Sequence, residues 1–181
     1  KYNVEDIAIT SVVPKISDSY TKYCRNLMGI NPFEVNYKNS GIKLKVDKPN
    51  EVGTDRICNT AAAKKLGCPA IIGDIGSATN YDVIDENGAF IGGAIAPGLE
   101  TAAHNLFKKA ALLKDTVLTI PTSAIGKNTN TNLQSGIMLG AIDVIDGMLY
   151  RMETETGWKK INIIITGGFG ELISPHLQTK H

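Results

Sequence analysis

Two short segments place a carboxylate beside groups that could contact a phosphate or hold an alcohol. In the first, Asp74 ends an apolar stretch and is followed by Gly76, Ser77 and Thr79. A turn of this composition can present backbone N–H groups and hydroxyls to phosphate oxygens while the carboxylate holds a cation. The same residues also fit a plain capped hairpin turn, because a D-x-G-S pattern is short and common.

The second segment is Gly53-Thr54-Asp55-Arg56, where a carboxylate and a guanidinium are adjacent at the predicted start of a helix. An N-cap Asp55 followed by an exposed Arg56 would explain both residues without any further function. However, the loop of residues 49–53 leads into this segment, and such loops often carry functional groups. Asp55 is therefore a candidate functional residue.

Two more segments could contact a ligand. Residues 125–132 (IGKNTNTN) are rich in side-chain donors and acceptors, and they fit either one wall of a ligand pocket or a solvated loop with Asn caps. Thr166-Gly167-Gly168 follows a β-branched stretch. That junction could let a nucleotide lie against backbone at a helix N-terminus, or it could be a tight strand-to-helix turn. The sequence contains neither the dinucleotide-binding nor the P-loop fingerprint.

Other chemistry finds less support. The three histidines show no metal-ligand spacing, and no serine stands in a G-x-S-x-G pattern. Gly136 and Gly140 lie four residues apart on a long helical pattern, so they permit a close helix contact. That contact could lie inside one chain or across a two-fold axis as a dimer seam.

The composition is close to the average of soluble globular proteins. The 181 residues are 43% hydrophobic and 20% charged, with a net charge of +1. This balance gives no bulk attraction to nucleic acid or to an anionic membrane, and no apolar run approaches the ~18–20 residues of a membrane span. Three cysteines without C-x-x-C spacing favour a reducing cytoplasm over a disulfide framework or a zinc site. We therefore expect a cytoplasmic protein with neither nucleic-acid nor membrane partners.

The hydrophobic patterns predict a mixed α/β scaffold for these segments. Residues 69–74, 81–85 and 89–96 form a strand meander, with a turn at 76–80 and a hairpin at Asn87-Gly88. This order differs from the strand–helix–strand of a dinucleotide fold. Further strands are predicted over 6–13, 32–35, 41–47 and 161–165, and helices over 17–28, 56–66, 98–113, 132–155 and 171–177.

Helix caps and a domain boundary follow from the same patterns. Ser17 or Asp18 is expected to cap the helix over 17–28, and Thr54 or Asp55 the helix over 56–66. Gly67 is expected to end the second of these helices. A domain boundary is predicted near Gly67, where a helix gives way to the strand meander.

Six segments in this order resemble the type III pantothenate kinases, and the resemblance covers nearly the whole chain. Each segment is weak alone, but six in sequence order are specific. Residues 11–14 also look like the family. The six are residues 49–56 (PNEVGTDR), 74–79 (DIGSAT), 92–99 (GGAIAPGL), 125–129 (IGKNT), 134–136 (QSG) and 166–168 (TGG).

The resemblance implies the actin-like, sugar-kinase-like fold, an α/β, ribonuclease H-like architecture in which two related domains flank a nucleotide cleft. Residues 1–67 would form the remainder of the first actin-like domain and residues 68–181 the second. The family begins with a strand that ends in an Asp-x-Gly-Asn-Thr phosphate loop, and this sequence has no match to it. We therefore expect an incomplete first domain, an interior portion of a longer protein, and no kinase activity from these 181 residues alone.

The resemblance also implies a function, namely ATP-dependent phosphorylation of pantothenate to 4′-phosphopantothenate, the first step of coenzyme A biosynthesis. It implies ATP with Mg²⁺, a monovalent cation (K⁺ or NH₄⁺), and a homodimer with pantothenate bound near the dimer interface. The residues that match the family's functional positions are Asp55 as catalytic base, Gly53, Thr54, Asp55 and Arg56 as substrate segment, Asp74 as cation ligand, Ser77 as ATP contact and Thr129 as pantothenate contact.

Three positions depart from the family pattern. Thr54 stands where Ala is usual, Ser77 where Thr is usual, and Val46 where many members carry a Tyr that contacts pantothenate. Two other functions stay open: a kinase-like regulatory protein of the same fold without pantothenate kinase activity, and a sugar or acid kinase relative with a different alcohol substrate. The joint presence of Asp55, Asp74 and Thr129 favours the enzyme.

Overall fold

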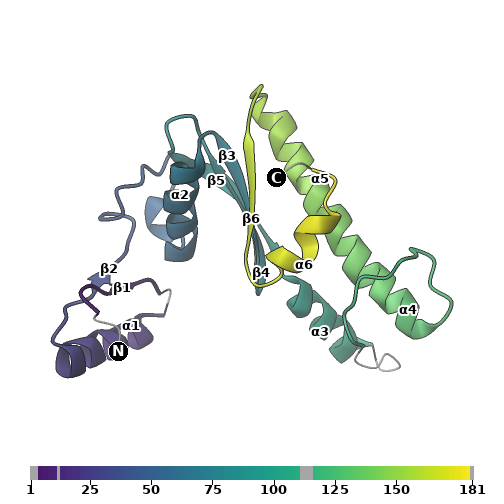
Figure 1. Ribbon diagram of the computed structural model, residues 1–181, viewed down its shortest axis with the longest axis horizontal. Helices are drawn as coiled ribbons and strands as arrows, with labels where there is room; N and C mark the ends of the chain where they lie inside the picture. The colour runs from purple at the N-terminus through teal and green to yellow at the C-terminus, as the bar shows by residue number, and fades with distance from the viewer. Residues whose placement is uncertain (1–3, 12, 111–115, 180–181) are drawn as a thin grey trace.

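A four-stranded mixed sheet forms the centre of the molecule (Figure 1). The structure is a computed structural model, and it describes residues 4–11, 13–110 and 116–179. The strands lie in the order β5-β4-β3-β6. The antiparallel meander consists of β3 (Ala70–Ile75), β4 (Ala78–Ile84) and β5 (Phe90–Pro97), and β6 (Asn162–Thr166) lies parallel to β3. The α/β class, the meander and the hairpin at Asn87-Gly88 are confirmed, and Gly88 has the positive φ of 70° that this turn requires.

Helices cover both faces of this sheet (Figure 1). On one face lies α2 (Thr54–Leu66), and on the other lie α3 (Leu99–Lys109) and α5 (Gly140–Thr156). The short α4 (Thr129–Gln134) continues through a π-helical turn at Ser135–Leu139 into α5. After β6 come α6 (Gly170–Ile173) and a 3-10 turn at Ser174–His176.

Alternate residues of the strands belong to two separate cores, as the period of two in a strand requires. One core lies between the sheet and α5, and its buried members include Ile71, Tyr81, Val83 and Leu149. The smaller core lies between the sheet and α2 and consists of Ala63, Ala70, Ile72 and Ile84. Each strand therefore has an α2 face and an α5 face.

The N-terminal region lies beside α2 and away from α5 (Figure 1). A parallel pair of two-residue strands, β1 (Ala8–Ile9) and β2 (Phe33–Glu34), packs with α1 (Pro14–Tyr23), which continues as a π-helical turn at Cys24–Met28. A 3-10 turn at Pro49–Glu51 leads to α2. The hydroxyl of Thr10 donates to that of Thr54 over 2.7 Å, which ties this region to the start of α2.

Several predicted elements are wrong in their bounds. The strand over 6–13 is only Ala8–Ile9 (residue 12 lies outside the described residues), and the turn at 76–80 is shorter because β4 begins at Ala78. The alternating stretch 41–47 is not a strand but makes one bridge, from Leu44 to Phe90. The helix predicted over 98–113 ends at Lys109, with residues 111–113 outside the description.

The predicted caps are also wrong, for a simple physical reason. The N-cap of α1 is Val13, because Pro14 is favoured in the first helical turn, and the N-cap of α2 is Gly53. The long helix begins at Thr129, because Asn128 forms a capping box with Thr131. Gly67 ends α2 as expected. The domain boundary near Gly67 stays a prediction.

Candidate functional site

The candidate site begins where β3 and β6 end. Asp74 pairs with Thr166 across these two parallel strands, so both strands direct their carboxyl ends to the same edge of the sheet. Ligands of α/β proteins usually bind at that edge. Asp74 belongs to the α2 face, and its Oδ2 accepts a hydrogen bond of 2.8 Å from the Nδ2 of Asn59 on α2.

The glycine turn after β6 lies directly against Asp74. A Cβ at Gly167 would stand 2.6 Å from Asp74 Oδ1 and 2.5 Å from the Ile75 nitrogen, and Gly167 has a positive φ of 92°. Only glycine therefore allows this approach. The structure brings together two segments that the sequence analysis treated separately, residues 74–79 and 166–168, and a narrow cradle forms beside Asp74 Oδ1.

Asp55 lies on the same side of the sheet, in the first turn of α2. It is exposed, and it stands four residues before Asn59 on the same helical face. Gly53 leaves room for its carboxylate, since a Cβ at Gly53 would lie 2.4 Å from Asp55 Oδ1. Gly53, not Asp55, is the cap of α2. Asp55 Oδ1 accepts from the backbone nitrogen of Arg56 over 2.9 Å, and its other carboxylate oxygen makes no hydrogen bond within the described part of the chain.

Arg56 does not extend into solvent as an exposed arginine. Its Nε donates to Oδ1 of Asp82 over 2.6 Å, and one Nη donates to the carbonyl of Tyr81 over 3.4 Å. Its guanidinium lies over the ring of Phe90, 5.2 Å from the centroid. Burial raises the pKa of Asp82 to about 6, although the charge and hydrogen bond of Arg56 lower it; Asp55 and Asp74 raise it further through repulsion.

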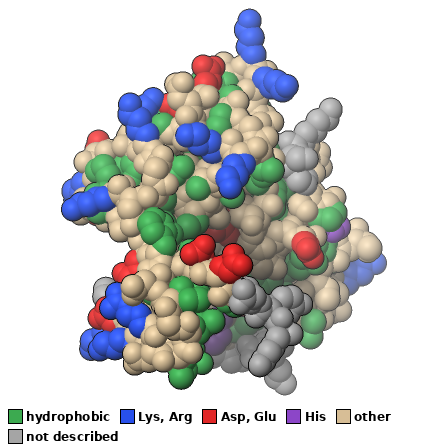
Figure 2. Space-filling view, turned by 60° about the vertical axis from the view of Figure 1, so that its left-hand side comes forward, with side chains coloured by type: hydrophobic (Ala, Val, Ile, Leu, Met, Phe, Trp, Pro, Cys, Tyr) green, Lys and Arg blue, Asp and Glu red, His purple; other side chains and the backbone are tan. Residues whose placement is uncertain are grey.

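Arg56 also lines a pocket of about 430 Å³ beside the edge strand β5. Val46, which departs from the family pattern, lies in this same pocket with Lys48 and Glu51. The backbone of Gly92 and Gly93 forms another part of the wall. In the face that Figure 2 shows, acidic side chains gather near the centre, where the surface is hollowed.

The other two predicted contacts lie apart from Asp55. Ser77 is exposed in the turn after β3, and its carbonyl accepts from the hydroxyl of Thr101 and from the nitrogen of Gly98. Thr129 is the exposed first residue of α4, across the sheet from α2 (Figure 1). One copy of the chain therefore brings Gly53, Thr54, Asp55, Arg56 and Asp74 to one side of the sheet and leaves Thr129 on the other.

Asn59 and Asp82 are site residues that the sequence analysis missed. The signal for Asn59 is its spacing of four residues from Asp55 on a helix. The signal for Asp82 is its place in a strand, two residues before Ile84 and hence on the same, helix-covered face. Neither signal is specific by itself, because neither residue can be assigned to the site until the position of the element that it contacts is known.

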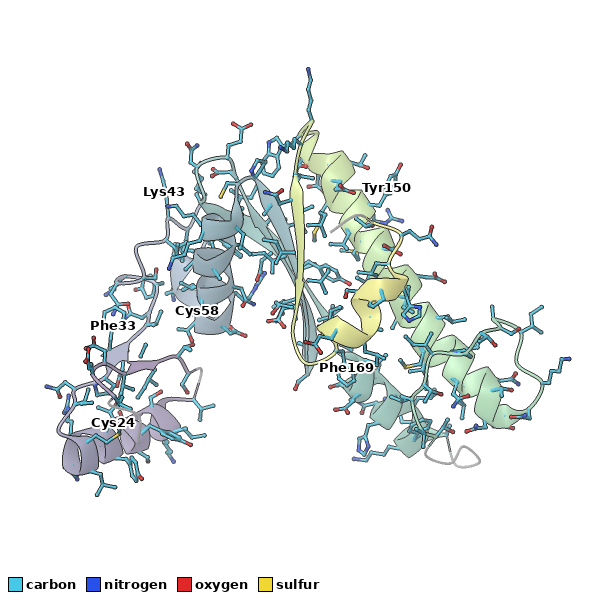
Figure 3. The ribbon with its side chains drawn as sticks, viewed as in Figure 1. Cys24, Phe33, Lys43, Cys58, Tyr150 and Phe169 are labelled. Atoms are coloured by element: carbon cyan, nitrogen blue, oxygen red, sulfur yellow. The ribbon has the colours of Figure 1, made fainter. Side chains whose placement is uncertain are left out.

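Among residues 4–11, 13–110 and 116–179, no group of three or more His, Cys, Asp or Glu side chains could hold a metal ion. Cys24, Cys58 and Cys68 carry free thiols; Figure 3 labels Cys58 on α2. Within the same ranges, no helix combines the length and apolarity needed to cross a membrane.

Fold and site together define a mixed α/β protein whose candidate site lies at the carboxyl ends of parallel strands. A family model described as type III pantothenate kinase matches residues 1–151. The chain belongs to the type III pantothenate kinase family, whose members are named for the transfer of phosphate to pantothenate.

Individual relatives agree with the family match. Enzymes named type III pantothenate kinase from Thermomicrobium roseum, a Roseiflexus species and Persephonella marina are 42%, 40% and 37% identical to this chain. The alignments cover 95%, 94% and 100% of the chain and 67%, 68% and 71% of those proteins.

A solved structure shares the fold. It is the crystal structure of a conserved Campylobacter jejuni protein assigned to the Baf family of transcriptional activators, with a TM-score of 0.64. The match covers 98% of this chain and 75% of the other, at 19% identity. At that identity, the match supports the architecture alone.

Proposed function

We propose that the enzyme containing this chain uses ATP to phosphorylate pantothenate to 4′-phosphopantothenate, the first step of coenzyme A biosynthesis. The observation that carries this proposal is family membership, since relatives named for this reaction are 37–42% identical over nearly the whole chain. The chain then has the actin-like, sugar-kinase-like fold, with residues 1–67 in the first domain and 68–181 in the second. The enzyme works in the cytoplasm.

Asp55 is the catalytic base of this reaction. Phosphoryl transfer passes through a loose transition state, in which the attacking alcohol needs positioning more than early deprotonation. A carboxylate can orient the hydroxyl of pantothenate and accept its proton late. The free carboxylate oxygen of Asp55 and the space that Gly53 leaves for this side chain support the role.

Pantothenate binds in the pocket that Arg56 and Val46 line. Pantothenate is an anion, and the guanidinium of Arg56 is a positive charge in this pocket, whereas the ammonium of Lys48 is paired with Glu51 over 2.8 Å. One Nη of Arg56, with two N–H groups, makes no hydrogen bond within the described ranges. It can therefore donate to the carboxylate of the substrate while Asp55, the preceding residue, lies at the substrate's hydroxyl.

ATP and a monovalent cation bind at the ends of β3 and β6. Ser77 contacts ATP, which brings its Mg²⁺, and the cation (K⁺ or NH₄⁺) lies beside Asp74. The cradle that any Cβ at Gly167 would fill suits a cation held by Asp74 Oδ1, because the other oxygen is taken by Asn59. A bound cation supplies positive charge that offsets the charge of the phosphates.

The enzyme is a homodimer in which Thr129 contacts pantothenate. Because Thr129 and Asp55 lie on opposite sides of the sheet, Thr129 of one copy can reach the pocket of another copy more readily than its own (Figure 1). Gly136 and Gly140 support an interface near α4. Apart from the backbone of its own helix, a Cβ at either position would meet no described atom within 4 Å, so both positions have room for a neighbouring helix.

A coupled ADP-release assay on the full-length protein tests the proposed function. We expect turnover with pantothenate and little or none with a panel of other alcohols, including sugars and hydroxy acids. Turnover with another alcohol in place of pantothenate would contradict the substrate. ATP binding without turnover would instead favour a regulatory protein.

The same assay tests the cation. We expect activity to rise with K⁺ or NH₄⁺ and hardly with Na⁺, because a large, weakly hydrated ion suits a site with one free carboxylate oxygen. Replacing Asp74 with Asn should remove this preference. Equal activity of the unaltered enzyme in sodium and potassium buffers would show that Asp74 is only a turn residue.

A further inference from the structure

A buried ion pair lies directly behind the substrate segment. The side chain of Asp82 is fully buried (0% exposed) on the α2 face of β4, and it contacts Arg56 through one oxygen only. Its Oδ2 has no hydrogen-bond partner among the described residues, although it is shielded from solvent. The charged groups that act on it are Arg56 and Asp55 on α2 and Asp74 on β3.

This ion pair leaves Arg56 little freedom. Asp82 holds the Nε, the carbonyl of Tyr81 accepts from one Nη, and the ring of Phe90 lies against the guanidinium plane. Gly93 leaves the room that this group occupies, since a Cβ there would come within 2.8 Å of that same Nη. The other Nη is the part of the group that remains for a ligand in the pocket beside Val46.

A role in stability alone explains this arrangement poorly. Burial of a charged pair costs solvation energy that the attraction often only balances, and apolar side chains of similar volume would pack α2 onto the sheet at least as well. The neighbouring contacts of α2 do so, because Ala63 packs on Ala70, Ile72 and Ile84 in an apolar cluster. The charged pair occurs at the end of α2 that carries the substrate segment.

We propose that Asp82 is a positioning residue for pantothenate binding: it orients the guanidinium of Arg56 so that one Nη faces the carboxylate of the substrate. This inference rests on the proposed function. Asp82 does not touch the substrate, and its loss is expected to change binding rather than the chemical step. Loss of the anchor lets the guanidinium rotate, which weakens the charge-assisted hydrogen bond to the carboxylate.

Steady-state kinetics of the full-length enzyme with pantothenate as the varied substrate test this role. In Asp82→Ala the acceptor is gone, and we expect the KM for pantothenate to rise at least tenfold while kcat and the KM for ATP change less than threefold. Asp82→Asn keeps an oxygen that accepts from Nε, and it should restore the KM to within about threefold. The matched control is Asp146→Asn, which removes a carboxylate that accepts from two backbone nitrogens on the α5 side and should leave both KM values unchanged.

A pH profile adds a readout that a purely structural role would not move. Because burial raises the pKa of Asp82 to about 6, the anchor loses its charge as the pH falls through that value. The kcat/KM for pantothenate of the unaltered enzyme should therefore decline below about pH 6, by no more than the roughly threefold loss expected for the uncharged Asn side chain. This step should be absent in Asp82→Asn, whose side chain does not titrate.

The outcomes separate this inference from the proposed function. Turnover of pantothenate by the unaltered enzyme with an unchanged KM in Asp82→Ala would overturn only the role of Asp82. A complete lack of pantothenate turnover in the unaltered enzyme would overturn both proposals. If Asp82→Ala does not fold, the pH profile of Asp82→Asn decides. A pH step that persists in Asp82→Asn contradicts the role of Asp82, and a step that disappears in this variant supports that role.

Discussion

Neighbouring residues on β4 show how differently the two faces of one sheet are used. Tyr81 and Asp82 are both fully buried, and each has an oxygen without a hydrogen-bond partner in the described part of the chain. Tyr81 lies among apolar side chains on the α5 face, where burial raises the pKa of its hydroxyl to about 12 and keeps it neutral. Asp82 lies on the α2 face with Arg56, near Asp55 and Asp74.

One face of the sheet supplies most of the buried apolar packing, while the other carries the candidate site. The α5 face holds the larger core, and Figure 3 shows side chains of α5 directed toward the sheet, with Tyr150 labelled on that helix. The α2 face has only a small apolar cluster at one end and charged residues at the other. Substitutions on the two faces should therefore affect different measured quantities.

Asp55→Asn should give the largest effect. The Asn side chain is nearly isosteric but cannot accept the proton of the alcohol, so kcat should fall by about 10²–10⁴, equivalent to roughly 3–5 kcal/mol of barrier. Stability should change by no more than about 1 kcal/mol, because Gly53 is the cap, and the Asn oxygen can still accept the hydrogen bond that Asp55 Oδ1 accepts from the backbone nitrogen of Arg56. The measurement is steady-state turnover together with urea unfolding of the full-length enzyme. Near-normal kcat in a folded variant would exclude Asp55 as the base.

Leu149→Ala should affect the opposite face in the opposite way. Leu149 is 0% exposed in the α5 core, and its truncation should lower the free energy of unfolding by about 2–5 kcal/mol. The KM for pantothenate and kcat per folded molecule should stay unchanged at a temperature where the variant is folded. Urea unfolding and active-site-normalised kinetics measure the two effects. A changed KM would mean that the two faces do not act independently.

The sequence predicted the parts of this fold that depend on local patterns. The meander and its hairpin follow from alternation and from Asn87-Gly88, and α2 follows from its helical spacing between Gly53 and Gly67. The stretch 41–47 alternates equally well, yet only Leu44 finds a partner, at Phe90. Alternation indicates which residues could pair but not whether a neighbouring strand is present.

The candidate site was predictable only as far as its segments can be recognised one at a time. Asp55 and Asp74 stand in recognisable motifs, whereas Asn59 joins them only because α2 packs over β3. Asp82 is similar, since a charged residue in a buried strand has no evident purpose until Arg56 is placed above it. Long-range packing decides such contacts, and it is not encoded in any short window of residues.

Gly53→Ala should disturb the α2 face through a single methyl group. The backbone of Gly53, with φ −57° and ψ 142°, suits any residue, so stability should change by only a few tenths of a kcal/mol to about 1 kcal/mol. The new Cβ would, however, lie 2.4 Å from Asp55 Oδ1 and force the carboxylate to rotate. A displaced catalytic group should lower kcat roughly 10-fold to 100-fold. Unchanged kcat with pantothenate would mean that the carboxylate need not occupy this position.

Gly140→Ala should have the smallest effect, and it tests whether the outer surface of the long helix is covered by a second copy. A Cβ at Gly140 would meet no described atom of this chain within 4 Å, and nearby Val144 is 57% exposed. In a free monomer, Ala should stabilise the helix by about 0.5–1 kcal/mol. At a close two-fold contact, the added methyl group should instead weaken the dimer.

We expect the dimer dissociation constant of Gly140→Ala to rise about tenfold, which corresponds to about 1.4 kcal/mol. Analytical ultracentrifugation of the full-length enzyme over a range of concentrations measures this change. Tyr150→Phe is the matched control: Tyr150 is 68% exposed further along the same helix, and this variant keeps the aromatic ring and adds no atom to the backbone contact. An unchanged mass distribution together with a higher unfolding midpoint in Gly140→Ala would show that this surface faces solvent, and the site for pantothenate would then have to form without Thr129 of a second copy.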